Sequence, residues 1–228
     1  MKEAGFLYPT ALLQGRDFVI LAREQEDRRS EISCLEEKTM KQRVDRIVKL
    51  GLLAALSILL VMVIHFPIFP AVSFLEYDMA DVPILIGGFL YGPGWGLLLT
   101  LAVSVLQGIT VSAGSGWIGI VMHFVATGAF VLVAGSIYQK KHDHKGALLA
   151  LAAGSLTMIA VMIPLNMLLT PLFMVGPEFP YAAAQQMVIS QFMGYIIAFN
   201  AIKTIVNALI TLLLYKSISK ILKKEFVH

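Results

Sequence analysis

The sequence predicts an all-α integral membrane protein, a bundle of six transmembrane helices with both termini in the cytoplasm. Of its 228 residues 57% are hydrophobic and 14% are charged, whereas soluble domains carry about 25% charged residues. Long uncharged apolar runs alternate with short polar segments, and the basic residues gather in a few of these segments. The net charge of +3 is too small to indicate a nucleic-acid partner.

Six apolar segments are the expected spans. A membrane helix needs about 20 apolar residues, with a range of about 17–25, and five of the six segments reach that range. The second segment is too short to cross alone, so it either extends back into the preceding loop or is a broken helix. A short interfacial helix is expected in the long loop over residues 171–194. The expected spans are residues 50–66, 83–91, 95–111, 118–138, 147–170 and 195–215.

The distribution of Lys and Arg orients these spans. Basic residues precede the first span, follow the sixth, and lie between the fourth and fifth. The loops after the first, third and fifth spans carry no Lys or Arg. Because cytoplasmic loops are enriched in Lys and Arg, both ends of the chain are expected in the cytoplasm. The loop after the first span then faces outside.

Residues 1–39 differ from the rest of the chain, because they are rich in charge and hold only short apolar runs. They lack the pattern of a signal peptide. Met40 opens a basic segment just before the first span, as a natural protein start would. We therefore expect residues 1–39 to be an N-terminal extension, disordered or read from a mis-assigned upstream start, and residues 40–228 to form the membrane domain. A short cytoplasmic amphipathic helix is the alternative for the extension.

The loop after the first span carries an acidic cluster. Residues 74–83 read FLEYDMADVP and contain Glu76, Asp78 and Asp81. The stretch over residues 50–139 contains no other Asp, Glu, Lys or Arg. An unpaired charge at the centre of a bilayer costs about 2.5–3.5 kcal/mol on insertion scales. The acidic loop is therefore expected to face water or to line a cavity.

The sixth span carries three polar residues on one face. Asn200, Lys203 and Asn207 are spaced by three and four residues, so they point the same way from a helix. Lys203 lies eight residues beyond Tyr195, roughly 12 Å of helix at 1.5 Å per residue. An intramembrane lysine indicates a functional site. The alternative is a structural lysine paired with a carboxylate or with carbonyls, and the nearest candidates are the carboxylates of the acidic loop.

Other polar residues in the spans are weaker candidates. Asn166 in the fifth span follows Pro164 by two residues and is the second strong binding candidate. His123 in the fourth span is more typical of a packing residue. Gln107 and Thr127 are expected to make hydrogen bonds between helices.

Two patterns in the loops resemble ligand sites but are not expected to be sites. A G-x-G-x-x-G pattern over residues 114–119 joins two membrane spans, whereas a dinucleotide site needs it between a strand and a helix. The run His-Asp-His over residues 142–144 lies in a basic loop, where adjacent side chains are usually solvated. No metal site is predicted. The lone Cys34 can form no internal disulfide.

Three parts of the sequence together resemble a known protein family. The loop over residues 74–83, Asn166, and the sequence FNAIK at residues 199–203 together resemble the riboflavin-specific S-component of energy-coupling factor (ECF) vitamin transporters. The resemblance covers residues 40–228. His123 stands where similar proteins are expected to have an amide side chain.

The resemblance implies a six-helix subunit of the cell membrane that binds riboflavin from outside and is not an enzyme. Riboflavin is its transported ligand, and no cofactor is implied. Its partners would be a transmembrane coupling subunit and two cytoplasmic ATPase subunits. Gly51 and Ala55, on one face of the first span, would pack against the coupling subunit. By resemblance, the ligand would contact the side chains of Asn166, Asn200 and Lys203 and be capped by Leu75, Glu76 and Tyr77, partly through their backbone. Asp78 is counted among the binding residues as well.

Two other functions are compatible with the sequence. An S-component for another vitamin, or for the phosphorylated flavin FMN, is the nearer alternative. A membrane-embedded transferase of lipid head groups could hold a metal on Asp78 and Asp81, but such enzymes need further acidic ligands and basic phosphate binders, which are missing. The chain has no G-x-x-x-x-G-K-[ST] sequence, so no ATPase activity of its own is expected.

Overall fold

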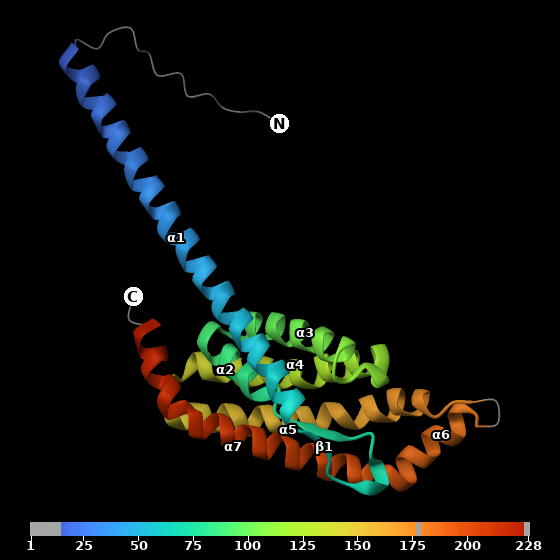
Figure 1. The fold of residues 1–228 in the computed structure, drawn as a ribbon. Helices are drawn as coiled ribbons and strands as arrows, with labels where there is room; N and C mark the ends of the chain where they lie inside the picture. The colour runs from blue at the N-terminus through green and yellow to red at the C-terminus, as the bar shows by residue number, and fades with distance from the viewer. Residues whose placement is uncertain (1–14, 177–178, 226–228) are drawn as a thin grey trace. The chain divides into compact units, whose positions relative to one another are not determined.

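The computed structural model describes residues 15–176 and 179–225, which are mostly helical (Figure 1). Short 3₁₀ turns lie at Pro70–Val72, Ala113–Ser115 and Thr170–Phe173, and a π-helical segment, Val188–Phe192, joins α6 to α7. The chain divides into two compact units, Met1–Val48 and Lys49–His228. The main elements are α1 (Gly15–Val63), β1 (His65–Pro67), β2 (Glu76–Asp78), α2 (Asp81–Tyr91), α3 (Pro93–Ile109), α4 (Gly116–Lys140), α5 (His144–Leu169), α6 (Tyr181–Met187) and α7 (Met193–Glu225).

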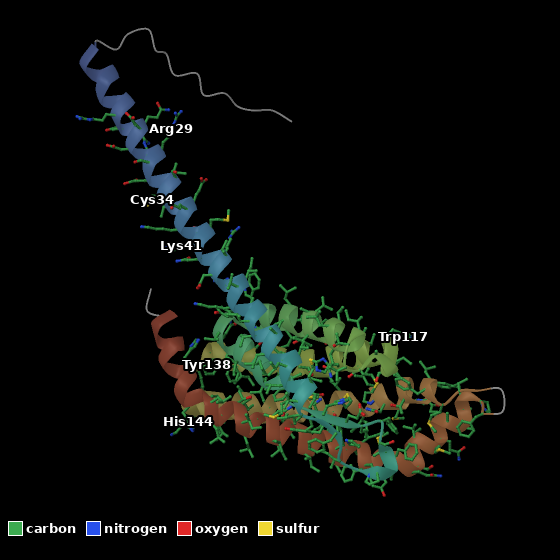
Figure 2. The ribbon with its side chains drawn as sticks, viewed as in Figure 1. Arg29, Cys34, Lys41, Trp117, Tyr138 and His144 are labelled. Carbon is green, nitrogen blue, oxygen red and sulfur yellow. The ribbon has the colours of Figure 1, made fainter. Side chains whose placement is uncertain are left out.

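The first unit contains the N-terminal part of α1. Residues 15–39 are helical, whereas the sequence favoured a disordered extension, and residues 1–14 lie outside the described chain. Charged helix formers spaced by one turn favour this helix, and Arg28 lies 3.8 Å from Glu24 in one such pair. The side chains described in this stretch are exposed, and those of Arg29, Cys34 and Lys41 project from the helix in Figure 2.

Four helices in the described chain are long and apolar enough to cross a membrane. They lie within Arg23–Val63, Ala113–Lys140, His144–Phe173 and Tyr181–Leu214. Helices α2 and α3 are apolar but shorter, with 11 and 17 residues. The predicted all-α membrane fold is therefore confirmed, and the short second segment does extend back to Asp81. The count of six crossings and the cytoplasmic position of both ends stay predictions.

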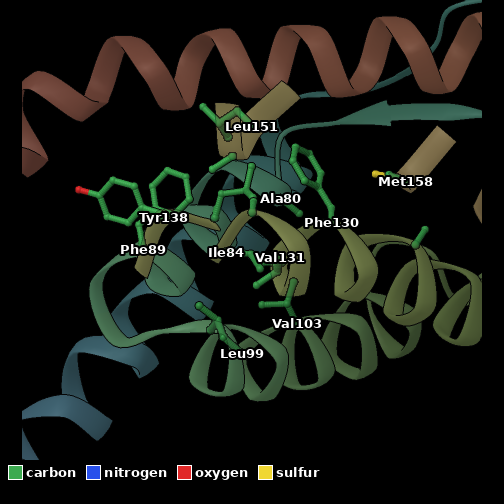
Figure 3. Packing of buried hydrophobic residues seen from close by; sticks show 14 of the residues in the cluster. Ala80, Ile84, Phe89, Leu99, Val103, Phe130, Val131, Tyr138, Leu151 and Met158 are labelled. Carbon is green, nitrogen blue, oxygen red and sulfur yellow. The ribbon is translucent and has the colours of Figure 1, made fainter. Parts of the chain in front are cut away.

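The second unit is built on a row of packed helices. Helix α4 packs between α3 and α5, α5 packs against α7, and α2 contacts α3, α4 and α7. Figure 3 shows buried side chains of the main cluster, including the stacked rings of Phe89 and Tyr138, whose centroids lie 4.4 Å apart. Gly96 of α3 packs closely on Gly88 of α2, and a Cβ on Gly96 would overlap the side chain of Val131. Small residues of this kind let membrane helices approach closely.

The β1–β2 hairpin is held on α7 by a second apolar cluster. The strands are antiparallel, and His65 is opposite Asp78. Val72, Leu75 and Tyr77 from the hairpin region pack with Ile196 and Phe199 of α7, as does Val188 of the π segment. This packing places the acidic loop beside the face of α7 that carries the polar residues.

Candidate ligand-binding site

A cavity of about 660 Å³ lies between the hairpin region and α3, α4, α5 and α7. Small-molecule sites are typically about 300–1,000 Å³, with apolar walls and a few placed polar groups. Its apolar walls are formed largely by methionine and phenylalanine side chains. Six of the seven residues that the sequence singled out for ligand binding line it together: Leu75, Glu76, Asp78, Asn166, Asn200 and Lys203.

Tyr77 is the seventh, and its side chain does not line the cavity. Successive side chains of a strand point to opposite faces, so Tyr77 points away from the side that Glu76 and Asp78 share. Its hydroxyl donates to Oδ1 of Asn207 at 2.9 Å. The structure therefore places Tyr77 as a support of the hairpin and does not bring its side chain to the cavity.

Lys203 forms a buried ion pair with the acidic loop. Its Nζ donates to Oδ2 of Asp78 at 2.8 Å, and the backbone N–H of Ala80 donates to Oδ1 of Asp78 at 3.0 Å. Burial alone would raise the pKa of the Asp78 carboxyl, but the ammonium of Lys203 outweighs burial and holds that pKa below its ordinary value. The pairing of Lys203 with a carboxylate of the acidic loop, which the sequence analysis gave as the alternative to a ligand contact, is present in the structure.

Asp81, the second buried carboxylate, is bound entirely by neutral donors. The hydroxyl of Thr127 donates to its Oδ1 at 2.8 Å, and Nδ2 of Asn207 donates to its Oδ2 at 3.0 Å. The same Nδ2 lies 3.3 Å from the carbonyl oxygen of Asp78. Because both carboxylates are engaged by the chain itself, they do not form the open metal site that a transferase would need. No cluster of metal-ligating side chains was found among the described residues.

The two candidate asparagines differ in their free hydrogen-bonding capacity. Asn166 donates to the carbonyl of Met162 and accepts from the hydroxyl of Thr170, both at 2.8 Å. Asn200 donates to the carbonyl of Ile196 at 2.8 Å, and its Oδ1 has no partner. The donation to a carbonyl fixes which end of the Asn200 amide points along the helix, so an oxygen acceptor is left over.

Two further polar residues in the cavity lining hold a buried atom without a hydrogen-bond partner. Gln107 Oε1 and His123 Nε2 are buried without a hydrogen-bond partner, and both residues line the cavity. The sequence had treated Gln107 and His123 as packing or interhelical residues. Their position in otherwise apolar spans was the available signal, but only the three-dimensional contacts reveal that these atoms are unsatisfied.

A close contact between His65 and Glu76 lies at the hairpin edge of the cavity. Nε2 of His65 is 2.9 Å from Oε2 of Glu76, and both residues line the cavity. The Glu76 side chain is 41% exposed, so this edge of the site is in contact with solvent.

Gly51 and Ala55 lie on an outward face of α1. Both residues are exposed, and a Cβ added to Gly51 would meet nothing within 4 Å. Spacing by four residues places them one above the other on the helix. A close approach by another helix at this face is sterically open, and its role in docking stays a prediction.

The two loop patterns have structural roles. Asp143 is the N-cap of α5, and its carboxylate accepts from the backbone N–H of Gly146 at 2.6 Å. The G-x-G-x-x-G pattern runs from a 3₁₀ turn into α4 and follows α3 directly, so it lacks the strand–turn–helix setting of a dinucleotide site.

Comparison with known proteins identifies the family of the chain. The family described as ECF transporter, substrate-specific component, matches residues 45–215. The riboflavin transporter RibU of Staphylococcus aureus is 31% identical over 82% of this chain and 97% of its own length. RibU of Lactococcus lactis is 35% identical over 53% of this chain, and the match spans 60% of that protein's length.

A solved structure of the S component of a bacterial ECF transporter superposes with a TM-score of 0.65 and 27% identity, covering 79% of this chain and 99% of that one. The structural match and the family match cover most of the membrane domain. The chain therefore belongs to the substrate-specific components of ECF transporters.

Proposed function

We propose that this protein captures riboflavin outside the cell and delivers it inward, as the multi-pass substrate-binding subunit of an ECF transporter in the plasma membrane. The observation that carries the proposal is the convergence of Asn200, Lys203 and Asn166 on one cavity beside the acidic hairpin. The names of the relatives, riboflavin transporters in both cases, support the choice of ligand.

The chemistry of the cavity suits a flavin. Riboflavin combines a flat apolar ring with carbonyl acceptors, a ring N–H and a polyhydroxyl tail. Lys203 uses one N–H on Asp78 and, as a primary ammonium, has two further donors for a ligand carbonyl or hydroxyl. Asn200 offers a free acceptor. Methionine and aromatic walls such as Met158 and Phe199 supply apolar contact for the ring.

The transport step requires partners. The subunit docks on the transmembrane coupling protein through the face of Gly51 and Ala55, and two cytoplasmic ATPases drive the release of riboflavin to the inside. Six crossings with both termini cytoplasmic place the acidic hairpin outside, where it meets the incoming vitamin. The subunit reorients in the membrane to open the cavity inward.

Purification in detergent tests the proposal directly. Co-purified flavin makes the protein yellow, and titration of ligand-free protein with riboflavin should quench flavin fluorescence with saturation. The same titration with FMN, and competition by thiamine or biotin, tests the specificity. A well-folded protein that binds another vitamin and leaves riboflavin fluorescence unchanged would refute the assignment of the ligand.

A further inference from the structure

Three residues that line the same cavity, on α3, α4 and α7, each hold a buried side-chain atom without a hydrogen-bond partner: Gln107 Oε1, His123 Nε2 and Asn200 Oδ1. Asn200 belongs to the site already proposed, and His123 does not. We propose that His123 is a specificity-determining ligand contact whose neutral Nε2 accepts a hydrogen bond from an N–H or O–H of the bound flavin. This inference rests on the proposed function.

Ser104 fixes the tautomer of His123. The Oγ of Ser104 lies 2.7 Å from the carbonyl oxygen of Thr100 and 2.7 Å from Nδ1 of His123. A carbonyl oxygen can only accept, so the single hydroxyl proton of Ser104 is used on Thr100. Nδ1 of His123 must therefore carry a proton and donate it to Ser104 Oγ. In the neutral ring the other nitrogen, Nε2, is then an acceptor.

The chain itself does not satisfy this acceptor. The nearest charged atom, Oδ1 of Asp81, is 3.7 Å from Nε2, which is beyond hydrogen-bond distance. Asp81 also already accepts hydrogen bonds from Thr127 and Asn207. The ring is nearly buried, with 12% of the side chain exposed. Native proteins rarely leave such an atom unpaired, so a donor is expected from the molecule that fills the cavity.

The ligand chemistry that meets this requirement is an N–H or hydroxyl donor. A flavin offers two sources, the ring N–H between its carbonyls and the hydroxyls of its tail. An amide side chain at this position would present both a donor and an acceptor, whereas His123 with Nδ1 held by Ser104 presents only an acceptor. His123 therefore favours ligands that carry a hydrogen-bond donor where they face its Nε2.

Ligand analogues combined with His123 variants test this role. His123→Phe keeps a ring but removes both nitrogens, and His123→Gln keeps an amide oxygen near the position of Nε2. We expect His123→Phe to weaken riboflavin binding about tenfold, the size of one ordinary hydrogen bond, and His123→Gln to recover most of that loss. His144→Leu, at the start of α5, is the control for removing a histidine outside the cavity.

Two analogues separate the sources of the donor. If the ring N–H is the donor, N3-methylriboflavin should bind wild type more weakly than riboflavin does. Its affinity should then be the same for His123→Phe as for wild type. If a tail hydroxyl is the donor, lumiflavin, which lacks the tail, shows this behaviour instead. An equal fold-loss for riboflavin and both analogues in His123→Phe would overturn the proposal, because a merely structural histidine does not distinguish ligands.

Stability measurements keep the test decisive. Thermal unfolding of the ligand-free variants in detergent identifies any that do not fold. If His123→Phe unfolds, the same comparison of ligands is made with His123→Leu, which also removes both nitrogens, and with Ser104→Ala, which removes the group that fixes the tautomer. Riboflavin affinity unchanged in both of these folded variants would equally contradict the role of His123.

Discussion

Nζ of Lys203 lies 2.8 Å from Oδ2 of Asp78, so an ion pair joins the middle of α7 to the hairpin across 125 residues of chain. Both side chains are buried, and both residues line the cavity. The sequence left two roles open for Lys203, a ligand contact and a structural ion pair, and the geometry allows one ammonium to fill both. Substitution of Lys203 therefore acts on the fold and on the site together.

Substituting each member of this pair should separate the two roles. Lys203→Met leaves the carboxylate of Asp78 buried without its cation, and breaking a buried pair in this way costs about 3–5 kcal/mol of stability. The double variant Lys203→Met with Asp78→Asn removes both charges and should recover most of that stability. Denaturation in mixed detergent micelles gives the stabilities.

Riboflavin binding should stay weak in the same double variant. A hydrogen bond to a charged group is worth about 1.5–3 kcal/mol, or about ten- to a hundredfold in affinity. Fluorescence titration measures the loss, and Lys145→Met on the loop after α4 is the control. Tight riboflavin binding by the folded double variant would remove Lys203 from the site.

The ion pair also predicts how stability depends on pH. The folded-state pKa of Asp78 lies below its ordinary value of 3.8 because of Lys203, which outweighs burial. A lowered pKa contributes stability that is fully present above the unfolded pKa and is lost as pH falls through the folded one. Thermal stability of wild type should therefore exceed that of the double variant at pH 7 by more than at pH 3. An advantage that grows on acidification would contradict this assignment.

Asn207 and Asn200 should respond differently to the same substitution. Asn207→Leu removes contacts to Tyr77, Asp81 and the carbonyl of Asp78, so it should destabilise the protein by at least about 1–3 kcal/mol. Asn200→Leu removes an unpartnered acceptor and one bond within its own helix, so it should weaken ligand binding with a smaller loss of stability. Unfolding curves and riboflavin titrations of the two variants give the comparison. The reverse pattern would show that Asn207 contacts the ligand.

The face of Gly51 and Ala55 should matter for assembly and not for ligand capture. Gly51→Phe places a large side chain on an exposed helix face, so riboflavin affinity should not change. Co-purification with the coupling subunit and uptake into vesicles should fall about tenfold or more, because close helix packing is lost. Leu156→Phe, at an exposed position of α5, is the control. Normal uptake by Gly51→Phe would show that docking uses another face.

Labelling of single cysteines should establish the orientation. In a Cys34→Ser background, Ala113→Cys and Val175→Cys should react with an impermeant thiol reagent added outside the cell. Lys145→Cys should react only after the membrane is opened, since basic loops face the cytoplasm. The opposite labelling pattern would put the acidic hairpin on the inner side.

Removal of residues 1–39 should leave the transporter intact. The family match begins at residue 45, and the described side chains before Met40 are exposed. Insertion, measured by membrane fractionation, and riboflavin affinity should both be unchanged in the shortened chain. Failure of that chain to insert would give the extension a structural role.

The sequence predicted well those features that appear as a pattern along the chain. Apolar runs predicted the helices, and the spacing of Asn200, Lys203 and Asn207 predicted that they share one face of α7. The direction of the Tyr77 side chain could not be predicted, because nothing in the sequence shows that the loop folds into a hairpin whose alternation turns this side chain away from the cavity.

The roles of His123 and Gln107 could not be predicted from the sequence. A single polar residue in a membrane span gives the same sequence pattern whether it contacts a neighbouring helix or a ligand. Only their contacts in the fold reveal that Nε2 and Oε1 are left over.

The π-helical segment Val188–Phe192 sets the rotation of α7. Before it, α6 is fastened to the end of α5: Gln185 donates to the carbonyl of Met167 at 3.1 Å, and the Tyr181 hydroxyl donates to the carbonyl of Leu168 at 3.0 Å. A wide turn inserts one extra residue into a helix, and each residue of an α-helix turns it by about 100°. Deleting one residue here would therefore swing Asn200 and Lys203 away from the cavity or break the α6 contacts, although no residue of the segment lines the site.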